Sequence, residues 1–427
     1  MADPDERQER PPHFRWNYAA HAADGWFVGG GMAFVNSGTV LPTLVTALGG
    51  TEWLISLVPL VSRAGYLLAP LLTAHRFDLR ERYMPVVRVF GVLLRLPYIV
   101  AALVLLFFGA RRPGLALCAV LAAPLLAGTS WGLGSNAWWQ LVVHTIPETR
   151  RASLMALRAA GTGVFGLAAG WGVRRILDLY PGTAGYAVLY LAASIMMAVS
   201  YLVFLTIRER PRPEHRDAER PTLVENLRSI PAILRADRQF ALFLGTTALL
   251  NGVLIVAPFL PVYAIRRLGV ADSYVGELVI FQTGGMLAGN LLLGWVGDRW
   301  GGKCLMVISR LGYVALAGLA FVAATEWGFR LVFFIGGVAG CAWMLGQGVL
   351  ALEICPDDRR STYLALVALC QMPGMLAAYL ISSALGDIEG GFRARLIVAA
   401  AFVLASLVLL LFLREPRKAR PDSRNSA

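Results

Sequence analysis

Twelve runs of about 20 or more mostly apolar residues follow one another along this chain of 427 residues. A helix needs about 20 such residues to cross a bilayer, so each run predicts one transmembrane helix. The predicted spans are 22–47, 53–74, 86–108, 114–143, 153–177, 185–207, 240–264, 274–296, 303–324, 330–354, 362–385 and 394–413. The expected fold class is therefore an all-α membrane protein.

The composition excludes several classes of soluble protein. Hydrophobic residues make up 57% of the chain and charged residues only 15%, whereas about a quarter of the residues in a soluble domain are charged. A soluble enzyme, a nucleic-acid binder and a disordered protein are therefore not expected. The net charge of +12 comes from basic residues in short blocks between the apolar runs, which is typical of loops at a membrane surface.

The basic residues also predict the orientation. In the loops, 26 Arg and Lys residues lie on one side of the predicted spans and 9 on the other, so both termini and segment 208–238 are expected in the cytoplasm. The chain divides into a cytoplasmic tail (1–20), a first helical bundle (21–207), a central cytoplasmic loop (208–238), a second bundle (239–413) and a basic tail (414–427). The first 20 residues are polar, so the first span is expected to act as its own insertion signal into the cell membrane.

A repeat relates the two predicted bundles. Residues 147–157 read PETRRASLMAL, and residues 356–366 read PDDRRSTYLAL. A weaker repeat relates Leu41-Pro42 to Leu260-Pro261. Cytoplasmic helix starts often carry such a basic pattern, but chance does not explain why both copies link a fourth span to a fifth. We therefore expect two pseudo-symmetric six-helix bundles, with a binding site between them near the bilayer midplane.

The strongest short motif lies between spans eight and nine. It reads GWVGDRWGGK from Gly294 to Lys303. This segment resembles the signature loop of the major facilitator superfamily, with Gly302 in place of one basic residue. The residues that fill the pattern are Gly294, Asp298, Arg299, Gly301 and Lys303.

The resemblance implies a cytoplasmic gate. Gly294 and Gly297 would let helices approach closely, and Asp298 would face the start of span five, near residues 150–153. Arg299 and Lys303 could pair with Glu353 or Asp357. The counterpart in the first half, AHRFDLRER at 74–82, is degraded and retains Asp78. The alternative is that the segment is only a charged turn.

Charged residues within the predicted spans are candidate functional groups. Asp24 could bind a proton or cation, could belong to the cytoplasmic gate, or could be an interfacial carboxylate or a partner for Arg158. Arg63 and Arg95 could meet an anionic substrate, although a packing role is favoured for Arg95. Glu277 could be protonatable or could belong to an outer gate.

By resemblance, spans one, four, seven and ten line the substrate cavity, and spans eight and eleven join them. The candidate cavity residues are Asn36, Asn136, Gln140, Asn251, Gln282, Gln347 and Gln371. Their amides suit a polar or amphipathic solute, and Trp131, Trp138 and Trp139 favour cargo with apolar or aromatic parts. The alternative is that the amides join helices and the tryptophans anchor them at interfaces.

No enzyme or cofactor motif stands out. Gly128-Thr-Ser130-Trp-Gly132 matches a nucleophile pattern, but that pattern needs a strand-to-helix turn, and His144 lies about 21 Å along the same predicted helix. The five cysteines have no paired spacing, and no metal, nucleotide or dinucleotide motif is found. We therefore expect no cofactor and no enzymatic activity.

The expected function is secondary active transport of a small organic solute by alternating access, coupled to an ion such as the proton. Efflux of amphipathic or drug-like compounds and uptake of a nutrient or metabolite both stay open. An intramembrane hydrolase using Ser130 and a non-transporting sensor are alternatives from other classes. The expected partners are a small-molecule substrate, the lipid bilayer and protons, with no nucleic acid. The resemblance implies a functional monomer.

Overall fold

The computed structural model describes residues 13–73, 82–209, 233, 235–355, 360–386 and 388–415. Within these residues every regular element is a helix. The first helices are α1 (Phe14–Phe34), α2 (Val40–Ala47), α3 (Glu52–Thr73), α4 (Met84–Phe108), α5 (Pro113–Thr145), α6 (Glu148–Leu179) and α7 (Thr183–Leu205). The later ones are α9 (Arg238–Leu250), the 3-10 helix η1 (Asn251–Ile255), α10 (Phe259–Leu268), α11 (Tyr274–Val322), α12 (Glu326–Ile354), α13 (Arg360–Ala384) and α14 (Ile388–Leu411).

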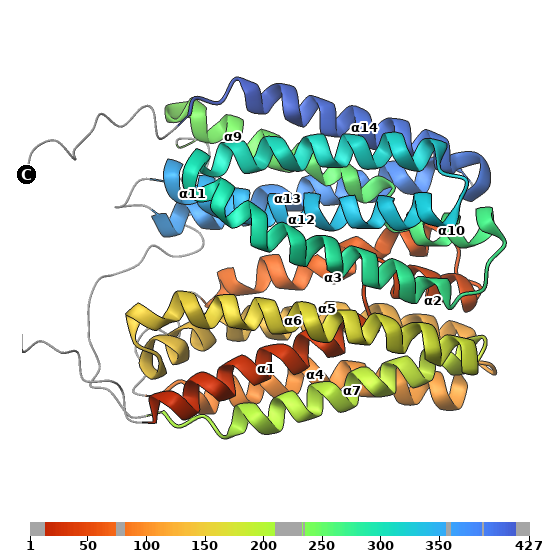
Figure 1. The fold of residues 1–427 in the computed structure, drawn as a ribbon, viewed down its shortest axis with the longest axis horizontal. Coiled ribbons are helices and arrows are strands. Elements are labelled where there is room, and N and C mark those ends of the chain that lie inside the picture. Colours follow the sequence, from red (N-terminus) through yellow and green to blue (C-terminus); the bar gives the residue numbers. More distant parts are fainter. Residues whose placement is uncertain are drawn as a thin grey trace, which may run out of the picture.

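The helices form two groups that lie side by side (Figure 1). The first group holds α1 to α7 and the second holds α9 to α14, and α6 packs against α11 and α3 against α13 across the boundary. Helix α1 begins and α14 ends at the same end of the molecule, on the left in Figure 1. We call this the terminal end and the opposite end, where α2 and α10 lie, the distal end.

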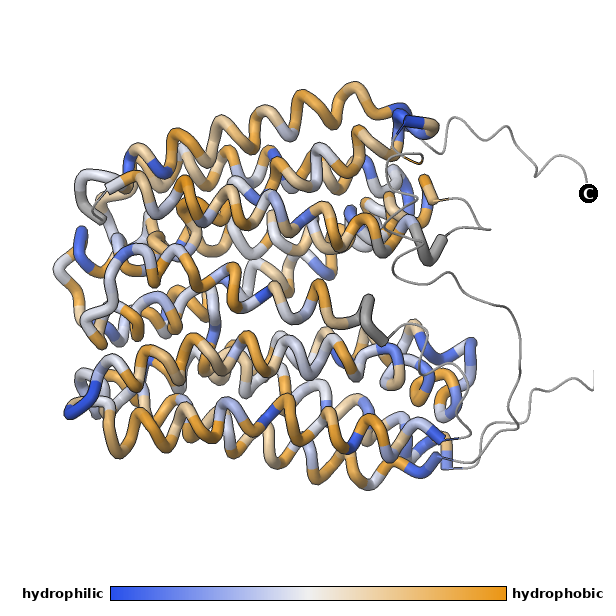
Figure 2. Tube along the Cα trace, turned by 180° about the vertical axis from the view of Figure 1, so that it is seen from behind, coloured by the Kyte–Doolittle hydropathy of each residue, from blue (hydrophilic) through white to orange (hydrophobic). Residues whose placement is uncertain are grey.

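Ten helices in the described part are long and apolar enough to cross a membrane. Hydrophobic residues run along the helices, and hydrophilic ones gather toward the two ends (Figure 2). One of the ten, α11, has 49 residues and would be about 75 Å long if straight, against about 30 Å for a bilayer core. It contains both predicted spans eight and nine, and its helical path breaks at Gly301, where φ is +83°.

The first predicted span of each half is interrupted, which corrects the expectation of continuous helices. Residues 22–47 form the end of α1, a turn and α2. Asn36 Oδ1 accepts hydrogen bonds from the backbone N–H groups of Gly38 (2.8 Å) and Thr39 (3.1 Å), so its side chain replaces helical hydrogen bonds. Residues 240–264 form α9, the 3-10 turn that starts at Asn251, and α10. Each half therefore has an irregular segment in its first span.

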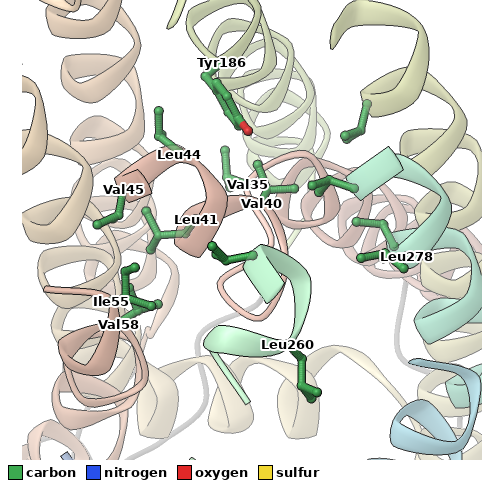
Figure 3. Close-up of a cluster of buried hydrophobic side chains, with 14 of the residues drawn as sticks. Val35, Val40, Leu41, Leu44, Val45, Ile55, Val58, Tyr186, Leu260 and Leu278 are labelled. Carbon is green, nitrogen blue, oxygen red and sulfur yellow. The ribbon is translucent and has the colours of Figure 1, made fainter. Parts of the chain in front are cut away.

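The hydrophobic cores show how the groups are joined. One core contains residues of both groups and includes α2 and α10, and Figure 3 labels Leu41 and Leu44 of α2 and Leu260 of α10 among its side chains. Toward the terminal end, the first group has its own core, which includes Trp138. The second group has another, which includes Phe240. The groups thus share a core at the distal end and have separate cores at the terminal end.

Polar contacts also join the two groups at the distal end. Two are ion pairs and two are hydrogen bonds, each between a residue of the first group and one of the second. They are Glu52 Oε2–Arg395 Nη2 (3.2 Å), Arg174 Nη1–Glu277 Oε1 (2.8 Å), Ser56 Oγ–Ser382 Oγ (3.1 Å) and Tyr186 Oη–Asp272 Oδ2 (3.4 Å). The distal end is therefore closed by both apolar and polar contacts.

Candidate binding cavity

A cavity of about 180 Å³ lies between the two groups of helices. Its wall includes the turn after α1, helix α3, the η1 segment, α11 and α12. The polar and aromatic lining residues are Ser37, Ser62, Arg63, Thr247, Asn251, Gln282, Tyr313, Phe333 and Trp343. Both interrupted helices therefore contribute to the wall, as expected where irregular backbone lines a cavity.

Arg63 is the charged residue of this cavity. Its guanidinium carbon lies 5.0 Å from the ring centroid of Trp343, which belongs to the other group, and Arg63 interacts electrostatically with Tyr313. Among the described residues, no hydrogen bond or ion pair is found for this guanidinium. A charged group inside a membrane protein is costly without a partner, so an unpaired arginine here is a candidate contact for a bound anion.

Four further polar atoms at the cavity have no hydrogen-bond partner among the described residues. They are Ser62 Oγ, Thr247 Oγ1, Gln282 Oε1 and Trp343 Nε1, and all four are buried. Most buried polar atoms in proteins have at least one partner. The residues that carry these atoms come from α3, α9, α11 and α12 and line one cavity, so together they form a polar site.

The predicted cavity residues are only partly brought together. Asn251 and Gln282 line the cavity, and Asn36 lies at its edge because Gly38, whose N–H it binds, is in the wall. The remaining four predicted residues, Asn136, Gln140, Gln347 and Gln371, are not part of its lining. The structure adds residues that the sequence argument did not select, and these are Ser62, Thr247, Tyr313 and Trp343. In the sequence, only the position of these residues in the middle of predicted spans could have indicated that they line a cavity.

A second cavity of about 310 Å³ lies within the first group. Most of its lining is apolar, and Trp131 and Trp138 belong to it. Asp24, Arg95 and Arg158 form the charged part of its wall. Of the three tryptophans proposed for a cavity, Trp139 is not in this lining and is half exposed.

Asp24 is at the centre of a buried ionic cluster. Its Oδ1 accepts hydrogen bonds from Ser200 Oγ (2.7 Å) and Arg95 Nη2 (3.3 Å), and its Oδ2 accepts one from Arg158 Nη1 (3.2 Å). Arg95 also donates to the backbone carbonyls of Met197 and Gly91, both at 2.8 Å. The ion pair with Arg158 that the sequence offered as one alternative is therefore present, and Arg95 holds helices together.

A second buried carboxylate, Glu209, was missed by the sequence argument. It accepts backbone N–H bonds from Tyr83 (2.9 Å) and Met84 (2.8 Å) at the start of α4, and His144 Nδ1 lies 3.4 Å from its Oε1. Burial raises the pKa of Glu209, but the interaction with His144 and the two N–H bonds outweigh it and lower the pKa below its usual 4.5. The glutamate therefore caps α4 from the end of α7.

The fold of this chain is similar to that of a solved transporter structure. A crystal structure of the nucleoside transporter NupG matches with a TM-score of 0.69 and 15% sequence identity, over 94% of this chain and 98% of that chain. The two proteins therefore share a fold. Residues 242–427 match the family model of the Major Facilitator Superfamily.

The second group of helices therefore carries the sequence similarity to the Major Facilitator Superfamily.

Two curated relatives of this chain are named as resistance proteins. The tetracycline resistance protein, class E, of Escherichia coli is 27% identical over 182 residues, which is 40% of this chain and 42% of that protein. The multidrug resistance protein MdtH of Aeromonas hydrophila is 28% identical over 188 residues, or 42% of this chain and 45% of that protein. The matches thus span less than half of each relative. The protein is a multi-pass protein of the cell membrane.

The superfamily signature loop forms the kink of α11. Gly301 has the positive φ that its glycine permits, and the N–H of Gly302 donates to Glu353 Oε2 at 3.2 Å. A side chain at Gly302 would meet the backbone of Leu350 at 2.4 Å, so this glycine allows α11 and α12 to touch. Lys303 donates to the carbonyl of Leu413. The described contacts of Gly302 and Lys303 thus lie within the second group.

Other residues of the loop have different surroundings. Arg299 lies over the rings of Trp295 (5.9 Å) and Trp300 (5.7 Å). Gly294 has no neighbour within 4 Å of an added Cβ, so the expectation that it permits a close helix contact is wrong. Asp298 lies on α11 one turn before the kink. Asp78 and Asp357 lie outside the described residues.

Ser130 and His144, the residues of the alternative hydrolase hypothesis, each contact a different residue and not one another. Ser130 Oγ donates to the carbonyl of Leu126 at 2.8 Å within α5, and His144 lies beside Glu209. The five cysteines are free. A search of the described residues finds no group of three or more His, Cys, Asp or Glu residues that could hold a metal ion.

Proposed function

We propose that this protein is a secondary active transporter that moves a small organic solute across the cell membrane by alternating access. One observation supports this most strongly: the two groups share a core at the distal end but have separate cores at the terminal end, and a polar cavity lies between them. Two groups joined at one end can rock about a central site, which is the motion that alternating access requires.

We further propose that the chain crosses the membrane twelve times and has both termini in the cytoplasm. Helix α11 is long enough for two crossings, and α1 with α2 would complete another. The basic residues gather in the loops on the side of the termini, which favours a cytoplasmic terminal end. In this orientation the structure represents a state that is closed on the outside.

In the opposite state, the signature loop would act as a cytoplasmic gate. The terminal ends of the two groups would meet, and Asp298 would then reach the start of α6, where backbone N–H groups are free to bind a carboxylate. Arg299, Lys303 and Glu353 would shape this contact from the second group. Asp78 would belong to the corresponding, degraded loop of the first group.

Asp24 is the proposed ion-coupling residue. It is 5% exposed, lies in the wall of the first-group cavity and bonds to two arginines from α4 and α6. Protonation of Asp24 would release Arg95 and Arg158 from their shared partner and would loosen the contact between these helices and α1. Proton binding at this position would therefore change how the first group packs.

Of the two directions of transport, we favour export, with amphipathic compounds as the substrates. Two relatives carry the names of tetracycline and multidrug resistance proteins, and the first-group cavity offers a mostly apolar wall with tryptophans. Uptake of a nutrient or metabolite is the second candidate, because the shared fold is also that of a nucleoside transporter. The mixture of polar and aromatic groups in the central cavity is compatible with either direction.

Transport in proteoliposomes tests the proposal. A panel of organic anions, cations and neutral solutes is offered with and without a pH gradient. We expect the wild type to accumulate at least one solute only when the gradient is present. Asp24→Asn should lose accumulation but retain exchange of labelled for unlabelled solute, because exchange needs no net proton movement. Glu326→Gln, which changes an exposed acid at the start of α12 outside the proposed gate, is the matched control and should behave as the wild type does.

Two results would contradict parts of this proposal. Transport that is indifferent to the pH gradient in both the wild type and Asp24→Asn would remove proton coupling. Measurable solute binding without movement of any solute would indicate a sensor built on a transporter fold.

A further inference from the structure

The charge of the central cavity is not balanced by its own wall. Arg63 is a cation, and none of the described residues that line the cavity is an aspartate or glutamate. Arg310, which also interacts electrostatically with Tyr313, adds a second positive charge behind the wall. Its hydrogen bonds go to neutral acceptors, including Ser406 Oγ (3.3 Å) and the carbonyl of Met306 (3.2 Å). The cavity therefore favours a negatively charged occupant.

We propose that the central cavity binds a small aromatic carboxylate. Arg63 would hold the carboxylate, because a guanidinium and a carboxylate match in charge and in planar geometry. The ring of Trp343 lies next to this guanidinium, so an aromatic ring attached to the carboxylate would lie against the tryptophan. The inference rests on the proposed transport function and names the class of solute.

The volume of the cavity limits the size of the ligand. At about 180 Å³ it is slightly larger than a cavity of about 150 Å³, which is known to hold benzene. A single aromatic ring with one or two small substituents therefore fills it. Larger drug-like molecules would need additional space, such as the first-group cavity, which shares the lining residues Ser37 and Ser62 with this one.

The four unpartnered polar atoms specify where further groups would bind. The indole N–H of Trp343 can only donate a hydrogen bond, the amide oxygen of Gln282 can only accept one, and the hydroxyls of Ser62 and Thr247 can do either. A ligand that has both a carboxylate and a hydroxyl group can satisfy more of these atoms than benzoate can. A hydroxybenzoate is accordingly the probe of choice.

Other classes of solute fit less well. An organic cation would approach Arg63 without any acid in the described wall to balance it. A neutral sugar could use the hydroxyl and amide groups but would leave the guanidinium unpaired. The ligand class thus follows from Arg63 and Trp343 together rather than from either residue alone.

Calorimetric titration of the purified full-length protein in nanodiscs tests the inference with 4-hydroxybenzoate, 4-hydroxybenzamide and benzyltrimethylammonium. The amide has nearly the same shape as the acid but no charge. We expect the acid to bind at least about tenfold more tightly than the amide, as is typical when a charge-assisted hydrogen bond is lost. The cation should bind still more weakly. Equal binding of acid and amide, or tighter binding of the cation, would overturn the inference.

Variants identify the residues that provide this preference. Arg63→Gln should remove the preference for acid over amide, and Arg63→Lys should keep part of it. Trp343→Leu should weaken both ring-bearing ligands alike. Arg266→Gln, which removes an exposed arginine outside the cavity, should leave the preference unchanged. If Arg63→Gln folds but keeps the full preference, the inference is wrong. If Arg63→Gln does not fold, the affinities of the wild-type protein for the three ligands decide whether the cavity prefers an aromatic acid.

This test and that of the proposed function fail separately. If the protein accumulates a neutral or cationic solute but binds no aromatic acid, the inference on ligand class fails while the transport proposal stands. If 4-hydroxybenzoate binds with the expected preference but no solute crosses the membrane, the ligand class stands and the transport proposal fails.

Discussion

The described buried arginines of this protein differ in whether a carboxylate pairs with them. In the first group, Asp24 lies between Arg95 and Arg158 and bonds to both. In the second, Arg310 is fully buried and its described hydrogen bonds are to uncharged atoms. Arg63 lies at the boundary between the groups with Trp343 as its neighbour. A bound anion would therefore correct an imbalance that the folded chain leaves in its centre.

The cap at Glu209 gives the terminal end a specific pH dependence. Because the pKa of Glu209 in the folded protein lies below its usual 4.5, the deprotonated glutamate stabilises the start of α4 above about pH 4.5, and this contribution is lost as the pH falls through the lowered folded pKa. We expect hydrogen exchange at Met84 and Val87, whose N–H groups donate to Glu209 Oε2 and to the carbonyl of Tyr83, to be slow and constant from pH 7 to about 5, after correction for intrinsic rates, and to accelerate at lower pH.

Glu209→Gln provides the control for this prediction. It keeps the size of the side chain but removes the charge, so the protection at α4 should be weaker at pH 7, by about 0.5–2 kcal/mol as for other helix caps. The acid-dependent loss should then disappear. A decline in protection centred near neutral pH in the wild type would contradict the assignment to Glu209.

At the scale of elements, α6 and α11 cross with their backbones close together at the boundary between the groups. A Cβ added to Gly276 would lie 2.4 Å from the backbone nitrogen of Arg174 and 2.6 Å from the carbonyl oxygen of Gly170. These are backbone atoms and cannot rotate away as a side chain can. The distal end can therefore close only because Gly276 has no side chain.

Gly276→Val should accordingly force the distal ends apart. We expect spin labels at Leu179 and Ala271, in a background without native cysteines, to show a population at longer distance than in the unsubstituted protein. Gly284→Val is the matched control, because it lies on the same helix and a Cβ there meets nothing within 4 Å. Identical distance distributions in Gly276→Val and the unsubstituted protein would contradict the role of this crossing.

The sequence predicted the helical elements well and their interruptions poorly. Apolar runs identified the spans because the bilayer requires a fixed length of apolar helix. The break at Asn36 depends on a side chain that binds the backbone of Gly38 and Thr39, and many asparagines in helices do not do so. For the same reason, the amides in spans could not be sorted by sequence into cavity residues such as Gln282 and buried ones such as Gln371. Which face each helix turns to the cavity depends on tertiary packing.

For the whole molecule, the distal ion pairs would bias the balance between the two states of the proposed transport cycle. Glu52 pairs with Arg395, and Glu277 pairs with Arg174 across the groups. Partly exposed pairs typically contribute about 0.2–1 kcal/mol each. Because both pairs exist only when the distal end is closed, they favour this state over its opposite.

Removal of both pairs should shift the equilibrium by about 2- to 30-fold toward the distally open state. The variant Glu52→Gln/Arg174→Gln tests this with the same pair of spin labels at Leu179 and Ala271, because Glu277 also pairs with Arg330 within the second group (2.6 Å) and that pair must stay intact. The control is Glu326→Gln, which removes a 2.6 Å ion pair to Arg330 within one group. An unchanged distal distance in the double variant, or an equal shift in the control, would count against this explanation.

The apolar packing of α2 against α10 has a consequence for the cell as well as for the protein. Val40, Leu41, Leu44 and Leu260 are all buried at this junction, and they offer no polar atoms in exchange for the water that surrounds an ion. A hydrated proton, sodium ion or chloride ion would have to shed its shell to pass. While the distal end is closed, these apolar side chains would keep ions from crossing the membrane through a protein that is not transporting solute. The membrane would then retain the electrochemical potential that other processes need.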